Sequence, residues 1–287
     1  MKSSRLLILF CILAIHISAI AQFDCSMDLR LLKHLIDSKK VNESLILSSF
    51  MLKEQNCTRQ IDSVVFFRGY AYYQLQQLDS ATSYLLKVQM PDSLYNKARF
   101  FALISSLYNN RVSLSDSIAQ TIKNTSQAIK DLNNLCRAGI SLYQGDIKNY
   151  QKFVKDLNPN NYLIGNEING LENTSKMLFQ KRKSPTKAAI LSTFLPGSGK
   201  WYLGKKGQAI TSFLTVGILA SIATEIIVKK GWNNFYSVSA LTTTAIFYGG
   251  NIYGSYYLGK YLNNRIDDKS KQDIQYYLHV AVRNVYQ

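Results

Sequence analysis

The chain has 287 residues, 47% of them hydrophobic, and a net charge of +16 at pH 7. This length allows more than one domain, and the basic excess favours an anionic partner, either nucleic acid or an anionic membrane surface. The N-terminus described next predicts export, and an exported chain rarely meets nucleic acid, so we expect a membrane surface and no nucleic acid.

Residues 1–21 have the three parts of a secretory signal peptide. Lys2 and Arg5 precede the apolar run 6–17, and the sequence Ala-Ile-Ala at 19–21 matches the small-x-small cleavage pattern. The apolar run is short for a membrane-spanning helix, although an uncleaved N-terminal anchor is the alternative. We expect a protein of the bacterial inner membrane whose N-terminal domain lies in the periplasm.

Basic residues are concentrated in the C-terminal part of the chain. Residues 181–287 hold 14 Lys and Arg against 4 Asp and Glu, whereas residues 22–180 hold 18 against 14. The segment 181–206 alone has seven basic residues and no acidic residue. This distribution predicts that the C-terminal part lies against anionic lipid headgroups.

The cysteines and histidines form no recognisable catalytic or metal-binding pattern. Cys25, Cys57 and Cys136 remain after signal-peptide removal, without a C-x-x-C spacing, and His34 and His279 lie far apart. The sequence also lacks the common hydrolase, zinc and nucleotide fingerprints. We therefore expect no enzyme, no cofactor and no metal site.

The first two of these cysteines flank the first expected helical hairpin. Antiparallel helices bring the two ends of such a hairpin together, and the periplasm is oxidising. We therefore expect a disulfide between Cys25 and Cys57, which leaves Cys136 as a buried thiol.

The first half of the mature chain is expected to be helical throughout. Apolar residues recur three and four positions apart, and short polar breaks separate the runs. The expected helices are residues 27–38, 42–56, 61–77, 80–90, 93–109, 115–123, 127–143 and 147–157. Pairs of Asp and Ser near several starts are expected to cap the first turns: Asp62-Ser63, Asp79-Ser80, Asp92-Ser93 and Asp116-Ser117.

The second hairpin, "IDSVVFFRGYAYYQLQQLDSATSYLLKVQMP", resembles a tetratricopeptide repeat. Gly69 stands where that family needs a small residue between two helices, and Ala81, twelve residues later, is the small residue of the second helix. The family's leading tryptophan is Val65 here, and its closing proline comes early, as Pro91. A weaker match around Gly139 follows about two repeat lengths later. A helical-hairpin array of no named family is the alternative.

The resemblance implies a groove that binds a protein partner. The family's groove positions fall on Ser63, Phe66, Tyr70, Tyr73 and Gln74. Aromatic rings at such positions suit a bound peptide or partner helix. The alternative is that these rings pack the core of the repeat.

The stretch 158–175 is polar and rich in Asn and Gly, so we expect residues 158–187 to be a linker with a basic segment, with a short helix after the Asn-rich part as an option. Two uncharged or nearly uncharged runs follow, at 207–228 and 235–258, and both are expected to span a membrane. Glu225, within the first run, is placed to pair with Lys229. A buried pair of helices in a soluble core is the alternative.

Small residues are expected to let the two spans approach each other. Gly250 and Gly254 form a G-x-x-x-G motif on the second span, and Gly217 with Ser221 repeats this spacing on the first. Such faces also allow a homo-oligomer.

The stretch "FLPGSGKWYLGKKG" before the first span contains Gly-Ser-Gly-Lys but is not a nucleotide-binding phosphate loop. Phe194 stands where that motif needs its first glycine, and Trp201 stands where it needs a hydroxyl for Mg²⁺. We expect instead a hinge at the membrane surface after a short interfacial helix. Glycine would provide its turns, and the rings and lysines would meet the headgroup layer. The residues of this membrane-surface motif are Pro196, Gly197, Gly199, Lys200, Trp201, Tyr202 and Gly204.

This stretch also resembles a recurring bacterial two-span membrane domain of unknown function with the signature Pro-Gly-x-Gly-x-x-Tyr-x-Gly. The resemblance covers about residues 185–263 and includes "GNIYGSYYLGKYLN" after the second span. The family's usual glutamine is Lys200 here. The tail that follows is expected to be a short amphipathic helix against the membrane or the repeat domain, with a short strand as the alternative.

The expected fold class is all-α, with a helical-hairpin, tetratricopeptide-like repeat domain and a C-terminal transmembrane hairpin. The expected organisation is a signal peptide (1–21), a repeat domain (22–157), a linker with a basic segment (158–187), an interfacial helix with two spans (188–262) and a tail (263–287).

The expected function is a non-enzymatic, membrane-anchored adaptor or scaffold of a bacterial cell envelope that binds a protein partner through its repeats. An accessory subunit of an envelope transport or channel complex, with Glu225 facing a path, is the first alternative. An envelope enzyme with an unmarked site is the least favoured alternative.

Overall fold

The computed structural model describes residues 25–53, 60–90, 93–180 and 182–286. Within these ranges every regular element longer than a single 3-10 turn is an α-helix and no strand is present, which confirms the all-α class. The expected signal peptide and Cys57 lie outside the described residues. The chain forms two compact units: unit 1 comprises residues up to Glu167 together with those from Leu278 onward, and unit 2 comprises Ile168–Tyr277.

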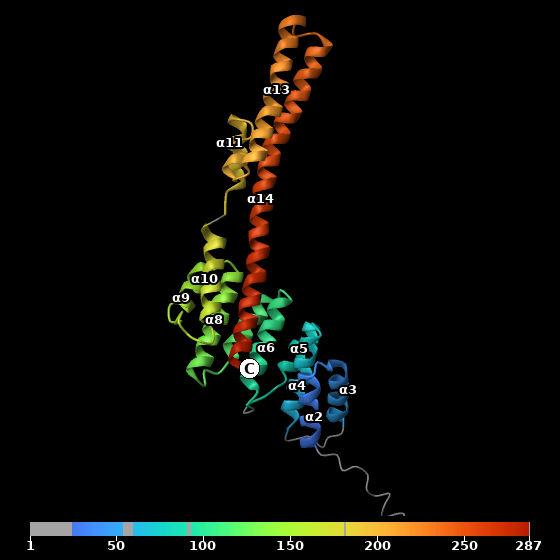
Figure 1. Ribbon diagram of the computed structural model, residues 1–287, viewed down its shortest axis with the longest axis vertical. Coiled ribbons are helices and arrows are strands. Elements are labelled where there is room, and N and C mark those ends of the chain that lie inside the picture. Colours follow the sequence, from blue (N-terminus) through green and yellow to red (C-terminus); the bar gives the residue numbers. More distant parts are fainter. Residues whose placement is uncertain (1–24, 54–59, 91–92, 181, 287) are drawn as a thin grey trace, which may run out of the picture. The chain divides into compact units, whose positions relative to one another are not determined.

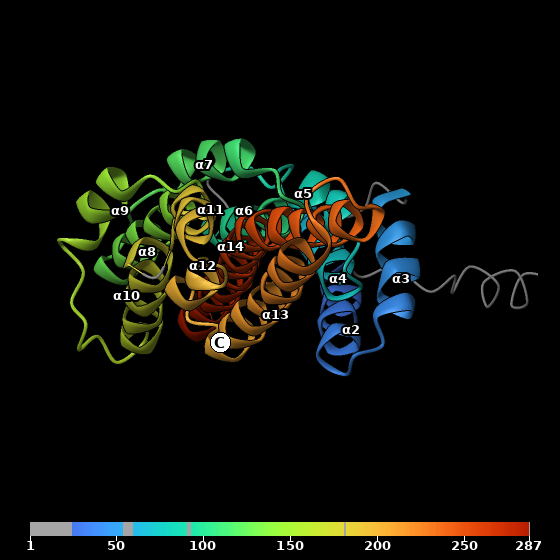
Figure 2. The same ribbon diagram turned by 90° about the horizontal axis from the view of Figure 1, so that it is seen from above.

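The N-terminal part of unit 1 consists of eight helices, and each of them corresponds to an expected helix. Neighbouring helices pack in pairs, α2 on α3, α4 on α5, α6 on α7 and α8 on α9, and Figure 1 and Figure 2 show these pairs as successive hairpins. Their bounds are α2 Cys25–Asp37, α3 Val41–Lys53, α4 Ile61–Gln74, α5 Leu78–Leu85, α6 Tyr95–Tyr108, α7 Val112–Thr121, α8 Gln127–Tyr143 and α9 Ile147–Val154.

All four hairpins turn in the same way. The first helix of each ends at a residue with positive φ, namely Lys39, Gln76, Asn110 and Gly145, and these residues are spaced 37, 34 and 35 positions apart. In each turn the N–H of this residue donates to the carbonyl three positions back, and the next N–H donates to the carbonyl five positions back. This is the Schellman arrangement, which satisfies the last carbonyls of a helix. Gly145 and, to a lesser degree, Asn110 have residue types that the left-handed conformation favours.

The core of unit 1 is centred on α6. Ala98 and every residue from Phe100 to Leu107 are buried, so that this helix is covered around most of its circumference. At the N-terminal end, Leu32, Ile36, Met51 and Val64 form the core where α2, α3 and α4 meet.

The expected Asp-Ser caps are wrong for three helices. The N-cap residues of α4, α5 and α7 are Gln60, Gln77 and Arg111, and none makes a side-chain cap hydrogen bond. Two of the aspartates instead accept hydrogen bonds from residues that follow other helices: Asp62 accepts from the backbone N–H of Gln89, and Asp79 accepts from Asn109 at 2.7 Å. The side chains that do cap helices are those of Ser126, Asp146 and Ser184.

Unit 2 contains most of α10, the short helices α11 and α12, the long helix α13 and most of α14. Their bounds are α10 Gly165–Gln180, α11 Pro185–Phe194, α12 Ser198–Tyr202, α13 Lys206–Lys230 and α14 Phe235–Tyr286. Two expectations are corrected here. The stretch expected as a linker holds the 16-residue helix α10. The second expected span and the tail are one continuous helix of 52 residues, so the boundary at 262 falls inside α14.

Of the described helices, α13 is the one whose length and composition suffice to cross a membrane, and only 11% of its most apolar stretch is buried. Large apolar side chains are exposed around it, among them Ile210, Leu214 and Ile218, each more than half exposed. A helix that is apolar on all sides needs an apolar environment, and lipid provides one.

Candidate functional site

Three aromatic side chains of α4, which we call the aromatic stripe, form one face of this helix in unit 1. Phe66, Tyr70 and Tyr73 follow one another at helical spacing. Their ring centroids lie 6.0 Å apart between Phe66 and Tyr70 and 6.1 Å apart between Tyr70 and Tyr73, and both pairs are stacked. Phe66 is buried and both tyrosines are half-buried. Of the other expected groove residues, Ser63 is half-buried and Gln74 is exposed.

The neighbouring helix α6 supports this stripe. Phe101 packs edge-on against Tyr70 at 4.9 Å and against Tyr73 at 5.2 Å between ring centroids. The rings are therefore held by edge-to-face contacts, a favourable geometry for aromatic pairs.

The residues that cover the stripe come from the end of the chain. We call Leu278–Tyr286, the part of α14 that belongs to unit 1, the C-terminal segment. The Tyr73 hydroxyl and Nδ1 of His279 lie 2.5 Å apart, and the two rings stack at 5.8 Å. At the other end of the stripe, Lys97 donates to the backbone carbonyl of Tyr286 at 3.3 Å and lies 5.7 Å from the Phe66 ring.

Most of the apolar face of the C-terminal segment is buried. Leu278, Ala281 and Val282 have no exposed surface. A Cβ added at Gly139 of α8 would come within 2.7 Å of the Leu278 side chain, so a glycine is needed for this close approach. The Asn284 side chain donates to the carbonyl of Leu163 at 3.0 Å, and this bond holds the segment against the residues that precede α10.

This arrangement is one amphipathic helix seated on a stripe of aromatic rings, which is a known mode of peptide recognition. Burial raises the pKa of Tyr73, and burial together with the nearby Arg283 lowers the pKa of His279. Their hydrogen bond is therefore between two neutral groups at neutral pH. The described residues contain no group of three or more His, Cys, Asp or Glu side chains that could hold a metal ion.

The sequence did not single out His279, Lys97 or Tyr286 as parts of this site. The signal that pointed toward it was the apolar face of the tail, because an amphipathic helix needs a surface to cover. The two surfaces expected for the tail were the membrane and the repeat domain. Leu278 and Val282 are buried in unit 1, which contains the expected repeat domain.

The membrane-surface motif of unit 2 forms two tight turns around α12. Gly197 and Gly204 both have a φ of +85°, so both adopt the left-handed conformation for which glycine is suited. Gly199 lies inside α12 and does not, which corrects the expectation of a turn at this residue. A Cβ at Gly199 would overlap the carbonyl oxygen of Ala188 in α11, and its N–H donates to Ser192 at 3.1 Å. Gly199 is therefore a contact point between two helices.

Among the other members of the motif, some side chains are exposed and others are engaged within unit 2. The Lys200 ammonium donates to the Ser212 hydroxyl of α13 at 2.6 Å, so it is engaged within the unit. Trp201 is 54% exposed, and the Lys206 ammonium lies 5.7 Å from its ring. Pro196 lies at the entrance of an apolar groove between α13 and α14.

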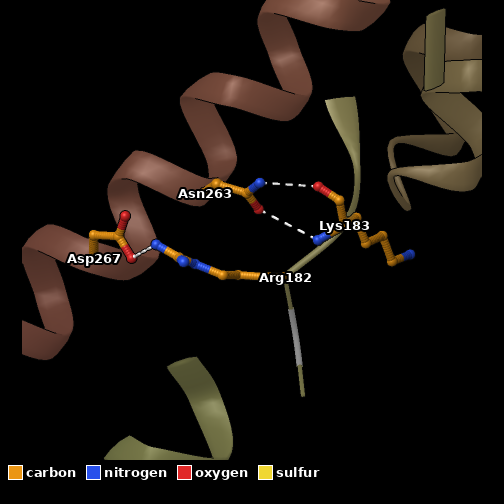
Figure 3. Close-up of polar contacts among 4 residues, drawn as sticks. All are labelled: Arg182, Lys183, Asn263 and Asp267. Atoms are coloured by element: carbon orange, nitrogen blue, oxygen red, sulfur yellow. Dashed lines mark hydrogen bonds and ion pairs between the residues drawn. The ribbon is translucent and has the colours of Figure 1, made fainter. Parts of the chain in front are cut away.

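The basic segment before α11 is clamped to α14, as Figure 3 shows. Arg182 pairs with Asp267. The side-chain amide of Asn263 donates to the carbonyl of Lys183 at 2.9 Å and accepts from its N–H at 3.3 Å. The Lys183 ammonium donates to the carbonyl of Tyr202 at 2.5 Å. These bonds hold the Lys183 side chain at the end of α12.

The small residues expected between the two spans make no such contact in this chain. A Cβ added at Gly217, Gly250 or Gly254 would meet nothing within 4 Å, and the Ser221 hydroxyl donates to the carbonyl of Gly217 in its own helix. The buried positions of α13 are Ala209, Val216 and Ala223. Glu225 is exposed and pairs with Lys229 on the same helix.

The cysteines agree with the expectation in the part that the structure describes. Cys25 is disulfide-bonded, and Cys136 is a buried free thiol. Because Cys57 lies outside the described residues, the pairing of Cys25 with Cys57 stays a prediction.

Comparisons with protein-family models, with curated proteins and with solved structures found no match to this chain.

Proposed function

We propose that this chain is a non-enzymatic, membrane-anchored helical-repeat adaptor of a bacterial cell envelope. The observation that carries the proposal is α13, a 25-residue helix that is long and apolar enough to cross a membrane and whose large apolar side chains are mostly exposed. An aqueous environment would penalise such a surface, and a bilayer would not.

The repeat part of the proposal is supported by the four equivalent turns of unit 1. Their spacing of 34 to 37 residues is close to the 34-residue period of tetratricopeptide repeats. The same two hydrogen bonds recur in each turn, which favours four copies of one structural unit over four unrelated hairpins.

The position of the C-terminal segment supports two membrane crossings. Tyr73 precedes α13 and His279 follows it, yet the two side chains are in contact inside unit 1. The chain must therefore cross a membrane an even number of times between them. With α13 as one crossing, we propose the uncharged first part of α14, residues 235–258, as the second. Unit 1 is then periplasmic, as the signal peptide predicts.

The aromatic stripe supports the adaptor part of the proposal, because it already holds a helix. In this chain the occupant is the C-terminal segment. A protein partner that uses the same rings would be an amphipathic helix with an aromatic or histidine side chain at the position of His279, and it would replace this segment.

Protease accessibility in spheroplasts tests the anchoring and the crossings together. One epitope tag follows residue 22 and a second follows residue 287 of the full-length protein. We expect protease to remove both tags from intact spheroplasts, while the protein stays in the membrane after carbonate washing. Removal of one tag with protection of the other would contradict two crossings, and recovery in the carbonate supernatant would contradict anchoring.

A matched pair of variants shows which helix anchors the chain. Ile218→Lys combined with Ile222→Lys places two charges on α13 and should release the protein from washed membranes. Ile46→Lys changes an apolar residue of α3 that is even more exposed, at 72%, and should leave the protein in the membrane.

A further inference from the structure

Four basic side chains of unit 2 surround one open pocket next to the N-terminal end of α13. They are Lys183, Lys205, Arg265 and Lys269, and we call the cavity the basic pocket. It has a volume of about 380 Å³, and Leu203 and Leu262 contribute to its apolar wall. Its four cations come from three separate segments, so the sequence gives no sign that they meet.

None of the described acidic residues lines this pocket. In the described part of the chain, none of the four cations takes part in an ion pair. The nearest ion pair in sequence, Arg182 with Asp267, neutralises itself. Four positive charges around one cavity repel one another, and a bound anion removes this repulsion.

The pocket is also preformed. Asn263 holds the backbone of Lys183 on both its N–H and its carbonyl (Figure 3). Arg265 and Lys269 lie one turn apart on α14, and Lys205 directly precedes α13. A site whose parts are fixed before binding loses less conformational freedom when a ligand enters.

The location and the lining together identify the ligand class. Lys205 directly precedes the helix that is long and apolar enough to cross a membrane, so the pocket lies where that helix would enter the headgroup layer. Cations placed beside apolar side chains match a phosphate group that carries an acyl chain. We infer that the basic pocket binds the headgroup phosphate of an anionic phospholipid. The inference rests on the proposed membrane anchoring.

This site differs from the one expected at the membrane-surface motif. Lys200 is engaged with Ser212, and of the motif residues only Gly204 lines the pocket. The pocket therefore assigns lipid recognition to Lys183, Lys205, Arg265 and Lys269, which all lie outside the motif.

The test uses full-length protein purified in a neutral detergent and lipid binding measured by native mass spectrometry. We expect one phosphatidylglycerol to bind per chain at least tenfold more tightly than phosphatidylcholine. Arg265→Gln combined with Lys269→Gln should weaken phosphatidylglycerol binding about 30-fold, since each cation near a lipid surface contributes roughly a fivefold change. Arg265→Lys keeps the charge and should retain most of the binding.

Lys187→Gln combined with Lys260→Gln is the matched control. It removes two exposed cations of unit 2 outside the pocket and should change binding less than twofold. An equal loss in both double variants would mean a diffuse attraction and would overturn the inference, as would equal binding of the two lipids. Melting curves identify any variant whose loss of lipid binding comes from misfolding. If the double Gln variant misfolds, retained binding in Arg265→Lys supports the inference and lost binding contradicts it.

Two further experiments are needed. The first distinguishes lipid binding from binding of soluble anions, and the second distinguishes a failure of the pocket from a failure of membrane anchoring. Glycerol 3-phosphate or inorganic phosphate at millimolar concentration should not displace phosphatidylglycerol. If either binds as tightly as the lipid, the pocket is a soluble phosphate site and the lipid assignment is wrong. A protein that stays in solution without detergent contradicts the anchoring, whereas an integral protein without lipid preference contradicts only the pocket.

Discussion

The hydroxyl of Tyr73 lies 2.5 Å from Nδ1 of His279, although 206 residues separate them in sequence. Burial and the nearby Arg283 lower the pKa of His279 below its usual 6.5. As the pH falls below 6.5, the unfolded chain binds a proton at this residue before the folded chain does. The contribution of His279 to the free energy of unfolding should therefore be at its maximum above pH 6.5 and decrease as the pH falls below 6.5.

Urea unfolding at pH 7.5 and pH 5.5 measures this effect. His279→Gln should reduce the loss of stability between the two pH values, whereas His34→Gln, which changes an exposed histidine, should not. An unchanged pH dependence in His279→Gln would mean that the titration of His279 is not the source of this loss of stability.

Gly139→Ala should destabilise unit 1 by about 1–3 kcal/mol, because the added methyl group meets Leu278 at 2.7 Å in a filled core. Leu278→Ala alone should cost about 2–5 kcal/mol. The double variant should cost less than the sum of the two, since the space left by Leu278 accepts the methyl group. Additive losses in denaturant unfolding would contradict the close approach of α8 and α14.

Two reciprocal substitutions test the shared turn of the hairpins. Gln76→Gly should stabilise the protein by about 1 kcal/mol and Gly145→Gln should destabilise it by a similar amount, because both positions have positive φ. A Cβ added at Gly145 would meet no other atom within 4 Å, so the change there is conformational. The unfolding midpoint should shift while the slope with denaturant stays constant; a loss in both variants would count against the shared turn.

The glycines of the membrane-surface motif should differ in their sensitivity. Gly197→Ala and Gly199→Ala should strongly reduce the amount of inserted protein, since each added Cβ meets backbone atoms of a neighbouring helix. Gly204→Ala has open space and should cost about 1–2 kcal/mol for its positive φ alone. Lys200→Ala loses one hydrogen bond to Ser212, worth about 1 kcal/mol. The same samples should show no saturable ATP binding; micromolar binding abolished by Lys200→Ala would revive a nucleotide site.

Thiol counting tests the disulfide. The native mature protein should react with no thiol reagent, because Cys25 is bonded and Cys136 is buried with a raised pKa. After unfolding without reductant, one thiol per chain should react. Three reactive thiols would show that Cys25 and Cys57 are not joined.

Helices α2 to α9 of unit 1 could be predicted because their apolar residues repeat with the helical period. The exact turns could not, since Lys39 and Gln76 adopt a left-handed conformation that their residue types do not favour. Asp62 and Asp79 match the usual cap pattern, yet tertiary hydrogen bonds use their carboxylates instead. Local patterns therefore located the helices but not their ends.

Helix α10 was missed because its first nine residues include three Asn and two Gly, which disfavour a helix. Its buried residues Ile168, Leu171 and Leu178 do recur at helical spacing, and this weaker signal could have identified it. The basic pocket had no comparable signal. Lys183, Lys205 and Arg265 lie far apart in the sequence, and only the clamp by Asn263 and the packing of unit 2 bring them to one cavity.

The order of synthesis gives the C-terminal segment a further significance. Tyr73 is made early, and its cover at His279 is made 206 residues later. At a synthesis rate of about 5–20 residues per second, the aromatic rings of α4 wait about 10–40 s for that cover. Unit 1 can therefore complete its folding only after residues 278–286 have been synthesised. A chain that stops before Leu278 would keep these rings uncovered and become a target for chaperones and proteases.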